Sequence, residues 1–135
     1  MSQQQKFPIQ LTEDEWRARL TPSQYQVLRQ HGTERPYTSP LNQEKRPGRF
    51  LCAGCGSALF EADTKFESGC GWPSFWAPLE HATATSQDSS HFMRRTEVHC
   101  AKCGGHLGHV FDDGPQPTGE RYCMNGVALK FVPKG

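Results

Sequence analysis

The chain of 135 residues has the size of one ordinary domain, and we expect residues 1–135 to form a single one. Its 15 lysines and arginines nearly balance its 14 aspartates and glutamates, and the formal charge of +1 argues against a nucleic-acid partner. No apolar run approaches the ~20 residues that span a bilayer, and the first residues hold no signal-peptide core. We therefore expect a soluble, cytoplasmic monomer that binds neither nucleic acid nor membrane.

Two short helices are predicted near the N-terminus. In "LTEDEWRARL", Thr12 and Glu15 have the spacing of a capping box at a helix start. In "TPSQYQVLRQHG", Thr21 and Gln24 repeat that spacing around a proline at the first helical position, and Gly32 suits the helix end.

After these helices the composition of the sequence changes, because Pro, Gly, Asn and Ser divide the chain into short segments. Strand-like runs occur at "RFLCAGC", "HFMRRTEVHC", "HVFDD" and "RYCMNGVALKFV". The sequence thus predicts a mainly β fold, with helices in residues 10–32 and a β core in residues 49–133.

Four of the six cysteines form two matched pairs: "CAGCG" contains Cys52 and Cys55, and "CAKCG" contains Cys100 and Cys103. In a reducing cytosol such spacing more often means metal binding or catalysis than disulfides. Two intervening residues let a turn aim both sulfurs at one ion, and the glycine after each pair can take a positive φ. We predict one structural zinc ion that staples the β core; the alternative is two disulfides or four free thiols. Four thiolates leave no open position, so such a zinc would stabilise the fold without catalysing hydrolysis.

Cys123 stands alone in "RYCMN". Strand alternation places Arg121, Cys123 and Asn125 on one face, where the arginine would stabilise a nucleophilic thiolate. The alternative is a buried, inert cysteine beside an exposed arginine.

Cys70 lies between two glycines in "ESGCGWPSFW", a segment that suits a loop able to carry a thiol over a short distance. The same residues also fit a plain glycine-rich turn anchored by packed aromatic side chains. His106 and His109 would face opposite ways in a regular strand, so a shared role requires a bend, which Gly108 could supply. Most histidine pairs have no such role.

In this order, and together with the two CxxC pairs, "CGWPSFW", "GHLGHVFDDGP" and "RYCMN" resemble the methionine sulfoxide reductase B family from Leu11 to Val132. The resemblance implies two antiparallel sheets in a β-barrel-like arrangement, with helices on the N-terminal side. It also implies reduction of methionine-R-sulfoxide, free or within proteins, to methionine.

The resemblance further implies a role for each matching residue. Cys123 matches the nucleophile that becomes a sulfenic acid, and Cys70 matches the resolving cysteine whose disulfide with Cys123 thioredoxin would reduce. Trp72 matches the aromatic wall for the substrate methyl group. The polar residues around the sulfoxide oxygen would be His106, His109, Arg121 and Asn125, and the zinc ligands would be Cys52, Cys55, Cys100 and Cys103.

An acid must protonate the sulfoxide oxygen, and His109 is our choice because histidine titrates near neutrality. One departure from the family pattern is "MNG" where "INS" is common, so that Gly126 removes a hydroxyl next to the catalytic strand. The alternative function is a non-catalytic, zinc-stapled module that binds a peptide or small ligand, which would not need Cys70, Cys123 or the histidines.

Overall fold

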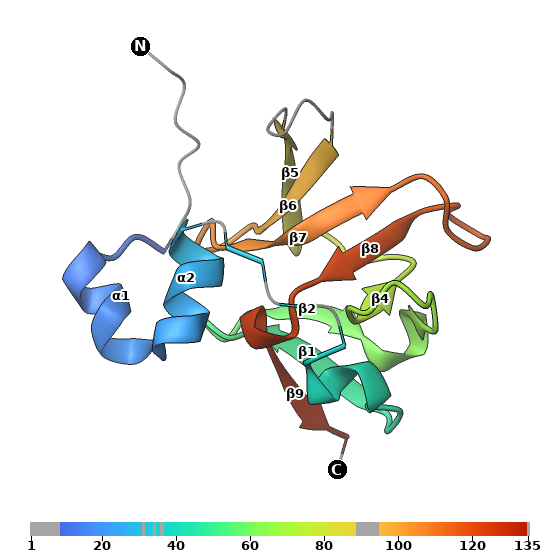
Figure 1. Ribbon diagram of the computed structural model, residues 1–135, viewed down its shortest axis with the longest axis horizontal. Helices are drawn as coiled ribbons and strands as arrows, with labels where there is room; N and C mark the ends of the chain where they lie inside the picture. The colour runs from blue at the N-terminus through green and yellow to red at the C-terminus, as the bar shows by residue number, and fades with distance from the viewer. Residues whose placement is uncertain (1–8, 31, 34, 36, 89–94, 135) are drawn as a thin grey trace.

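The computed structural model describes residues 9–30, 32, 33, 35, 37–88 and 95–134. In this part of the chain two α-helices lie to one side of a three-stranded and a six-stranded sheet, and every strand pairing described is antiparallel (Figure 1). The predicted fold class, mainly β with two antiparallel sheets and N-terminal helices, is confirmed. The beginning of the predicted run "HFMRRTEVHC" and both ends of the predicted domain lie outside the described residues.

The helices are α1 (Glu13–Arg19) and α2 (Pro22–Gln30). Both predicted capping boxes are present, because Thr12 and Glu15 exchange hydrogen bonds of 2.8 and 3.2 Å between side chain and backbone. Thr21 and Gln24 exchange a matching pair. Within the described residues, no helix is long and apolar enough to cross a bilayer.

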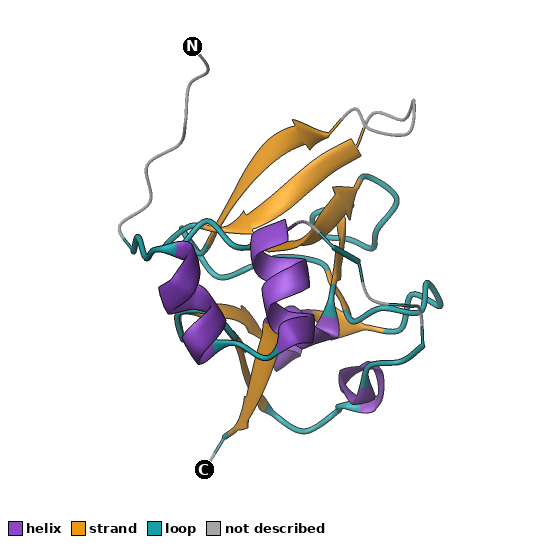
Figure 2. Cartoon of the chain, turned by 60° about the vertical axis from the view of Figure 1, so that its left-hand side comes forward, coloured by secondary structure: helices purple, strands orange, loops and turns teal. Residues whose placement is uncertain are grey.

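One face of each helix is buried. Trp16 of α1 and Leu28 of α2 are each 2% exposed, and α2 also lies against β7. The guanidinium of Arg29 lies 4.5 Å from the centre of the Trp16 ring and donates a hydrogen bond of 3.0 Å to the carbonyl of Cys103. The helices, drawn in front of the strands in Figure 2, are thereby fixed to the second CxxC turn.

The small sheet has the strand order β2-β1-β9, with β1 at Gly48–Cys52, β2 at Ala58–Glu61 and β9 at Leu129–Pro133. The large sheet has the order β3-β4-β8-β7-β6-β5. Its strands in that order are Lys65–Phe66, Ser74–Phe75, Arg121–Met124, His106–Phe111, Arg95–Cys100 and Thr83–Asp88.

The prediction of one strand over the run "RYCMNGVALKFV" is wrong. The chain leaves β8 at Asn125, makes a 3₁₀ turn over Gly126–Ala128 and enters β9 in the other sheet. Asn and Gly both disfavour strand interiors, and the amide of Ala128 closes the turn on the carbonyl of Asn125 at 3.0 Å. The break lets apolar residues on either side of it face one core from two sheets.

That core is centred on three phenylalanines, one from each of three strands. Phe75 of the large sheet stacks on Phe60 with ring centres 4.2 Å apart and meets Phe50 edge-on at 5.0 Å. All three are fully buried, so the two sheets pack through these rings. The packed sheets hold β8 rigidly, with one face against the core and the other available for a site.

Candidate active site and metal cluster

A row of polar side chains crosses the large sheet at the level of Cys123. The strand register pairs Cys123 with Ser74 of β4 on one side and with His109 of β7 on the other, and His109 in turn with Glu97 of β6. Directly paired residues project to the same face of a sheet. Because neighbours along a strand alternate, Tyr122 points to the opposite face and is buried in the core.

The sulfur of Cys123 has two close partners. Arg121, two residues earlier on the same face of β8, donates a hydrogen bond from Nη1 to Sγ at 2.7 Å. The Sγ atom of Cys70 lies 3.0 Å away, although the two cysteines are 53 positions apart in the sequence. Cys123 therefore contacts both a fixed positive charge and a second thiol.

Cys70 is held by the loop between β3 and β4. The hydroxyl of Ser68 donates to its sulfur at 3.0 Å, and the hydroxyl of buried Ser74 lies 3.3 Å from the same sulfur. Gly69 and Gly71 have φ values of +77° and +94°, a region that favours glycine. The tight path through these two glycines turns the thiol toward β8.

The two thiols share a hydrogen bond, so one of them ionises readily. That hydrogen bond lowers the pKa of the Cys70 thiol to about 4 and, together with burial, raises the pKa of the Cys123 thiol. The charge of Arg121 acts on Cys123 in the opposite direction and lowers its pKa. These directions place the negative charge mainly on Cys70, and the contact of Arg121 with Cys123 stabilises the other form of the pair, in which the shared proton lies on Cys70 and the charge on Cys123.

Arg121 is itself fixed from behind. The carboxylate of Asp113 accepts hydrogen bonds from Nε at 2.9 Å and Nη2 at 3.1 Å, and this pairing raises the pKa of Arg121 and lowers that of Asp113. The guanidinium carbon also lies 4.6 Å from the centre of the Phe111 ring. These contacts leave Nη1 to face Cys123.

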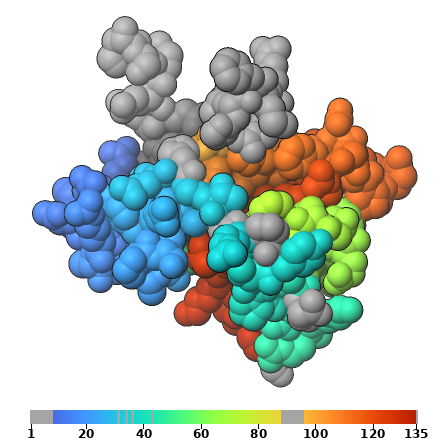
Figure 3. Space-filling model, in the orientation of Figure 1, coloured from blue at the N-terminus to red at the C-terminus, as the bar shows by residue number. Residues whose placement is uncertain are grey.

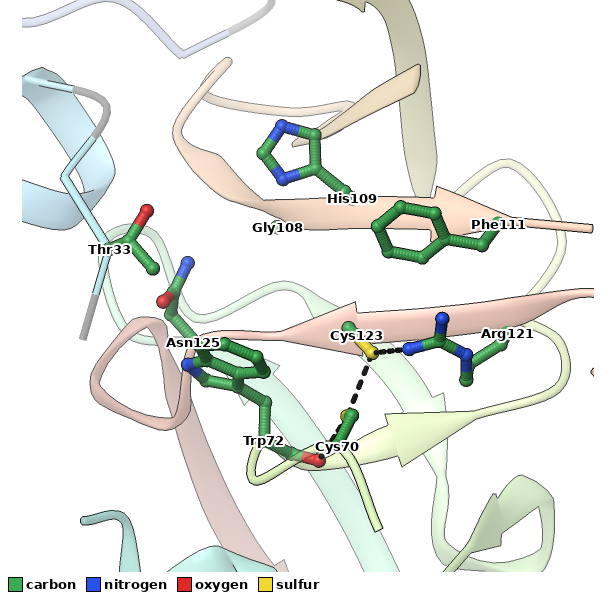
Figure 4. A pocket seen from close by; sticks show the side chains of 9 residues that line it. All are labelled: Thr33, Cys70, Trp72, Gly108, His109, Phe111, Arg121, Cys123 and Asn125. Atoms are coloured by element: carbon green, nitrogen blue, oxygen red, sulfur yellow. Dashed lines mark hydrogen bonds between the residues drawn. The ribbon is translucent and has the colours of Figure 1, made fainter. Parts of the chain in front are cut away.

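A cavity of about 320 Å³ opens above the two sulfurs (Figure 4). The indole ring of Trp72 and the ring of Phe111 supply apolar wall, and His109 and Asn125 supply polar groups. The complete lining is Thr33, Cys70, Trp72, Gly108, His109, Phe111, Arg121, Cys123 and Asn125. The volume suits one amino-acid side chain with part of its backbone.

The histidine pair is shaped by a bulge in β7. Val98 pairs with Gly108 and the next residue of β6 pairs with His106, so Leu107 is the extra residue. The carbonyl of Leu107 accepts hydrogen bonds from both the backbone and the side-chain amide of Asn125, each at 2.9 Å. The bulge thus positions Asn125 at the cavity.

His106 takes a different place from His109. His106 is 2% exposed and is not among the described residues that line the cavity; its ring centre lies 5.5 Å from that of His109. Nδ1 of His106 lies 2.5 Å from the carboxylate of Glu97, which is 8% exposed. The side chain of Glu97 also lies 3.5 Å from Nε2 of His99, so a buried polar group continues from His109 into the sheet.

The four paired cysteines form a cluster of their own, and none of them lines the cavity. Cys52 ends β1 in the small sheet and Cys100 ends β6 in the large one, and all four sulfurs lie within 4.8 Å of one another. The predicted glycines, Gly56 and Gly104, have φ values of +82° and +75° and close equivalent turns.

The cluster can hold a metal ion. Sulfurs at ~2.3 Å from one ion in a tetrahedron lie ~3.8 Å apart. The pairs Cys52–Cys103 and Cys55–Cys100 are separated by 3.7 and 3.6 Å. Contacts with the neighbouring sulfurs and burial raise the pKa of the Cys52 thiol, a cost that a bound cation removes. The donor set and its geometry therefore fit one tetrahedral ion that would link the two sheets.

Comparisons with known proteins identify the family of the chain. The SelR domain matches residues 20–133. A peptide methionine sulfoxide reductase MsrB from Pseudomonas putida (strain W619) is 58% identical over 93% of this chain and 96% of its own. The MsrB from Leptospira interrogans is 52% identical over 93% and 96%, and that from Methanosarcina mazei is 54% identical over 92% and 89%. This chain belongs to the MsrB family.

A solved structure similar to this chain is the crystal structure of the Mis18 "Yippee-like" domain. Its TM-score is 0.54, with 16% identity over 67% of this chain and 99% of that one. At such low identity the likeness concerns the fold alone.

For this MsrB-family chain, the cavity brings together Cys70, Trp72, His109, Arg121, Cys123 and Asn125, all named from the sequence. Of the lining residues, Thr33 and Phe111 were not named as site residues, and neither were Asp113, Ser74 and Glu97, which support the site from outside the lining. Asp113 stands beside Asp112 in the quoted motif, and the sequence gives no reason to prefer one of them. Ser74 belongs to a two-residue strand too short to show a pattern, and Glu97 is a charged residue in a strand that reads as half-exposed.

Proposed function

We propose that this MsrB-family protein reduces the R epimer of methionine sulfoxide, free or within proteins, with Cys123 as the nucleophile. The proposal rests on the surroundings of one atom, the sulfur of Cys123. Cys123 Sγ lies at the base of a cavity, 2.7 Å from the guanidinium of Arg121 and 3.0 Å from a second thiol.

In the first step the Cys123 thiolate attacks the sulfur of the sulfoxide. The substrate methyl group packs on Trp72, and the oxygen lies toward His109 and Asn125. His109 donates a proton to that oxygen, which makes the substrate sulfur a better electrophile. The oxygen passes to Cys123, methionine leaves with its sulfur reduced by two electrons, and Cys123 becomes a sulfenic acid.

Glu97 supports this step by holding His106 against the ring of His109. The buried carboxylate fixes the orientation of the His106 ring, and the packed ring then limits the rotation of its neighbour. His106 is in this view a support for His109 and does not itself reach the cavity.

The second step uses Cys70. Its sulfur attacks the sulfenic sulfur of Cys123, the S–O bond breaks and water leaves, so that a Cys70–Cys123 disulfide remains. A dithiol protein such as thioredoxin then reduces this disulfide by thiol–disulfide exchange.

For the cysteine cluster we propose Zn²⁺ as the ion. Four thiolates in a closed tetrahedron suit zinc, and such a site offers no position for substrate. The ion would hold β1 and β6 together and stabilise the single domain that carries the cavity.

The experiment measures methionine released from separated R and S epimers, in single turnover and in steady state. Cys123→Ser should release no methionine with any reductant. Cys70→Ser should release about one methionine per chain in a single turnover and turn over poorly with thioredoxin. Activity in Cys123→Ser, or reduction of the S epimer alone, would overturn the proposal.

A further inference from the structure

The loop that carries Cys70 is held from outside by a tyrosine far away in the sequence. The hydroxyl of Tyr37 donates a hydrogen bond of 2.7 Å to the carbonyl of Gly69, and its backbone amide donates one of 2.6 Å to the carbonyl of Gly71. One residue thus binds the carbonyls on both sides of Cys70. Figure 3 shows the cyan segment near residue 40 lying against the lime-green segment near residue 70.

The exposure and backbone conformation of Tyr37 are not those of a residue whose only role is to pack against the core. Its side chain is 73% exposed, so the ring buries little surface. Its φ of +66° lies in the left-handed region, which is unusual for a bulky aromatic residue. The two hydrogen bonds to Gly69 and Gly71 explain why Tyr37 keeps an exposed side chain and a disfavoured backbone conformation.

A second side chain reinforces the contact. Nδ2 of Asn42 donates to the same carbonyl of Gly71 at 3.1 Å. Gly71 and Gly69 both have positive φ values, and glycine has more conformational freedom than any other residue. A loop of this kind would scatter the Cys70 thiol over many positions unless its carbonyls were held.

We propose that Tyr37, assisted by Asn42, is a positioning residue for the second step of the reaction, in which Cys70 closes the disulfide with Cys123. This inference rests on the proposed function of the two cysteines. The step joins Cys70 Sγ to Cys123 Sγ and breaks the S–O bond of the sulfenic acid; the oxygen leaves as water with the proton of the Cys70 thiol. Holding two sulfurs at 3.0 Å raises the rate of such an intramolecular attack.

The first step does not depend on the hydroxyl of Tyr37. Tyr37 is not part of the cavity lining, and neither of its hydrogen bonds touches Cys123, Arg121 or His109. The hydroxyl bond to Gly69, which Tyr37→Phe removes, lies on the side of Cys70 away from Trp72, so its loss should leave methionine release unchanged and affect only what happens to the sulfenic acid.

The test is a competition for that sulfenic acid in a single turnover without reductant. A 1,3-diketone, which alkylates sulfenic acids, is added with the sulfoxide, and mass spectrometry gives the ratio of trapped Cys123 to Cys70–Cys123 disulfide. This ratio reports disulfide closure even when the first step is rate-limiting. Tyr37→Phe removes the hydroxyl alone, and Tyr25→Phe is the matched control because its hydroxyl bonds to Glu13 in the helices at 2.6 Å.

We expect the trapped-to-disulfide ratio to rise about two- to tenfold in Tyr37→Phe, the range for loss of one hydrogen bond, and further in Tyr37→Phe with Asn42→Ala. In Tyr37→Phe methionine release should match the parent, and the melting temperature should fall no more than in Tyr25→Phe, which also loses one hydrogen bond. In Tyr25→Phe the trapped-to-disulfide ratio should match the parent. An unchanged ratio in the double variant overturns the clamp while the role of Cys70 stands. If Cys70→Ser recycles normally with thioredoxin, the proposed function fails first, and the clamp with it.

Discussion

The carboxylate of Asp113 accepts two hydrogen bonds from the guanidinium of Arg121, at 2.9 and 3.1 Å, and leaves a third donor of that group facing the sulfur of Cys123. Two of the guanidinium nitrogens are used to fix the plane of the group. The third nitrogen, Nη1, then points at Cys123 and lies 2.7 Å from its Sγ atom.

Asp113→Ala should therefore slow the formation of methionine in a single turnover. Without the carboxylate, Arg121 gains rotational freedom and stabilises the Cys123 thiolate less; we expect a loss of about tenfold, the lower end for a charged hydrogen bond because Asp113 is exposed. Asp112→Ala, one residue away and outside the cavity lining, is the control. Equal rates in the two variants would mean that Arg121 holds its place without Asp113.

Gly108 of β7 pairs with Met124 of β8 and lies close to the backbone of that strand. A β carbon at this position would come within 2.0 Å of the carbonyl oxygen of Cys123, a backbone atom that cannot rotate away. Gly108→Ala should lower the free energy of unfolding by about 1–3 kcal/mol, the usual cost of forcing an extra carbon into a packed region.

Urea unfolding measures this cost, and Gly54→Ala is its control because a β carbon there has contacts of 3.4 Å or longer. Gly108→Ala should also displace Cys123 from His109, its partner in the register, and lower the single-turnover rate. A variant as stable and active as the parent would show that β8 can shift at no cost.

The predictions that succeeded rest on short-range chemistry. The capping residues Thr12 and Glu15 and the glycines after each CxxC pair act within a few residues, so the sequence alone contains the reason for them. The break at Asn125 was missed because the run on both sides of it is apolar and reads as one strand, and only packing against two sheets divides it.

The short distance between Cys70 and Cys123 could not be predicted from the sequence either, for a similar reason. It depends on β4, a strand of two residues, pairing with β8, and no periodicity can reveal so short an element. The site residues were named from a motif, whereas their distances follow from pairings between distant parts of the chain.

The cysteine cluster leads to a prediction about stability. Removal of the ion by a chelator, or Cys100→Ser, should lower the melting temperature sharply, because β1 and β6 would lose the link between the two sheets. Cys70→Ser, which alters a thiol outside the cluster, should melt close to the parent.

Metal analysis should give one zinc per chain, and X-ray absorption should give four sulfur neighbours at ~2.3 Å. Active protein without zinc, or Cys100→Ser that melts with the parent, would contradict the structural role of the cluster.

The shared hydrogen bond between Cys70 and Cys123 leads to a prediction about pH. Contact with Cys123 is the main cause that lowers the pKa of the Cys70 thiol to about 4, and Ser68 and Ser74 add to it. A thiol with a lowered pKa keeps its reactive thiolate as the pH falls, whereas an ordinary thiol near 8.5 loses about tenfold in thiolate per pH unit below that value. In the parent, alkylation of Cys70 by iodoacetamide should therefore change little from about pH 8 to about pH 5.5.

In Cys123→Ser the main cause is gone, the pKa of Cys70 should rise, and alkylation over the same range should fall at least tenfold toward acid pH. Cys123→Ala, which also deletes the sulfur but leaves no hydroxyl to donate a hydrogen bond, should fall more steeply than the serine variant. Peptide mass spectrometry follows Cys70 alone, so the cluster cysteines do not interfere. If Cys70 in both variants kept the flat profile of the parent, its thiolate would be stabilised by Ser68 and Ser74 rather than by Cys123, and the two sulfurs would titrate independently.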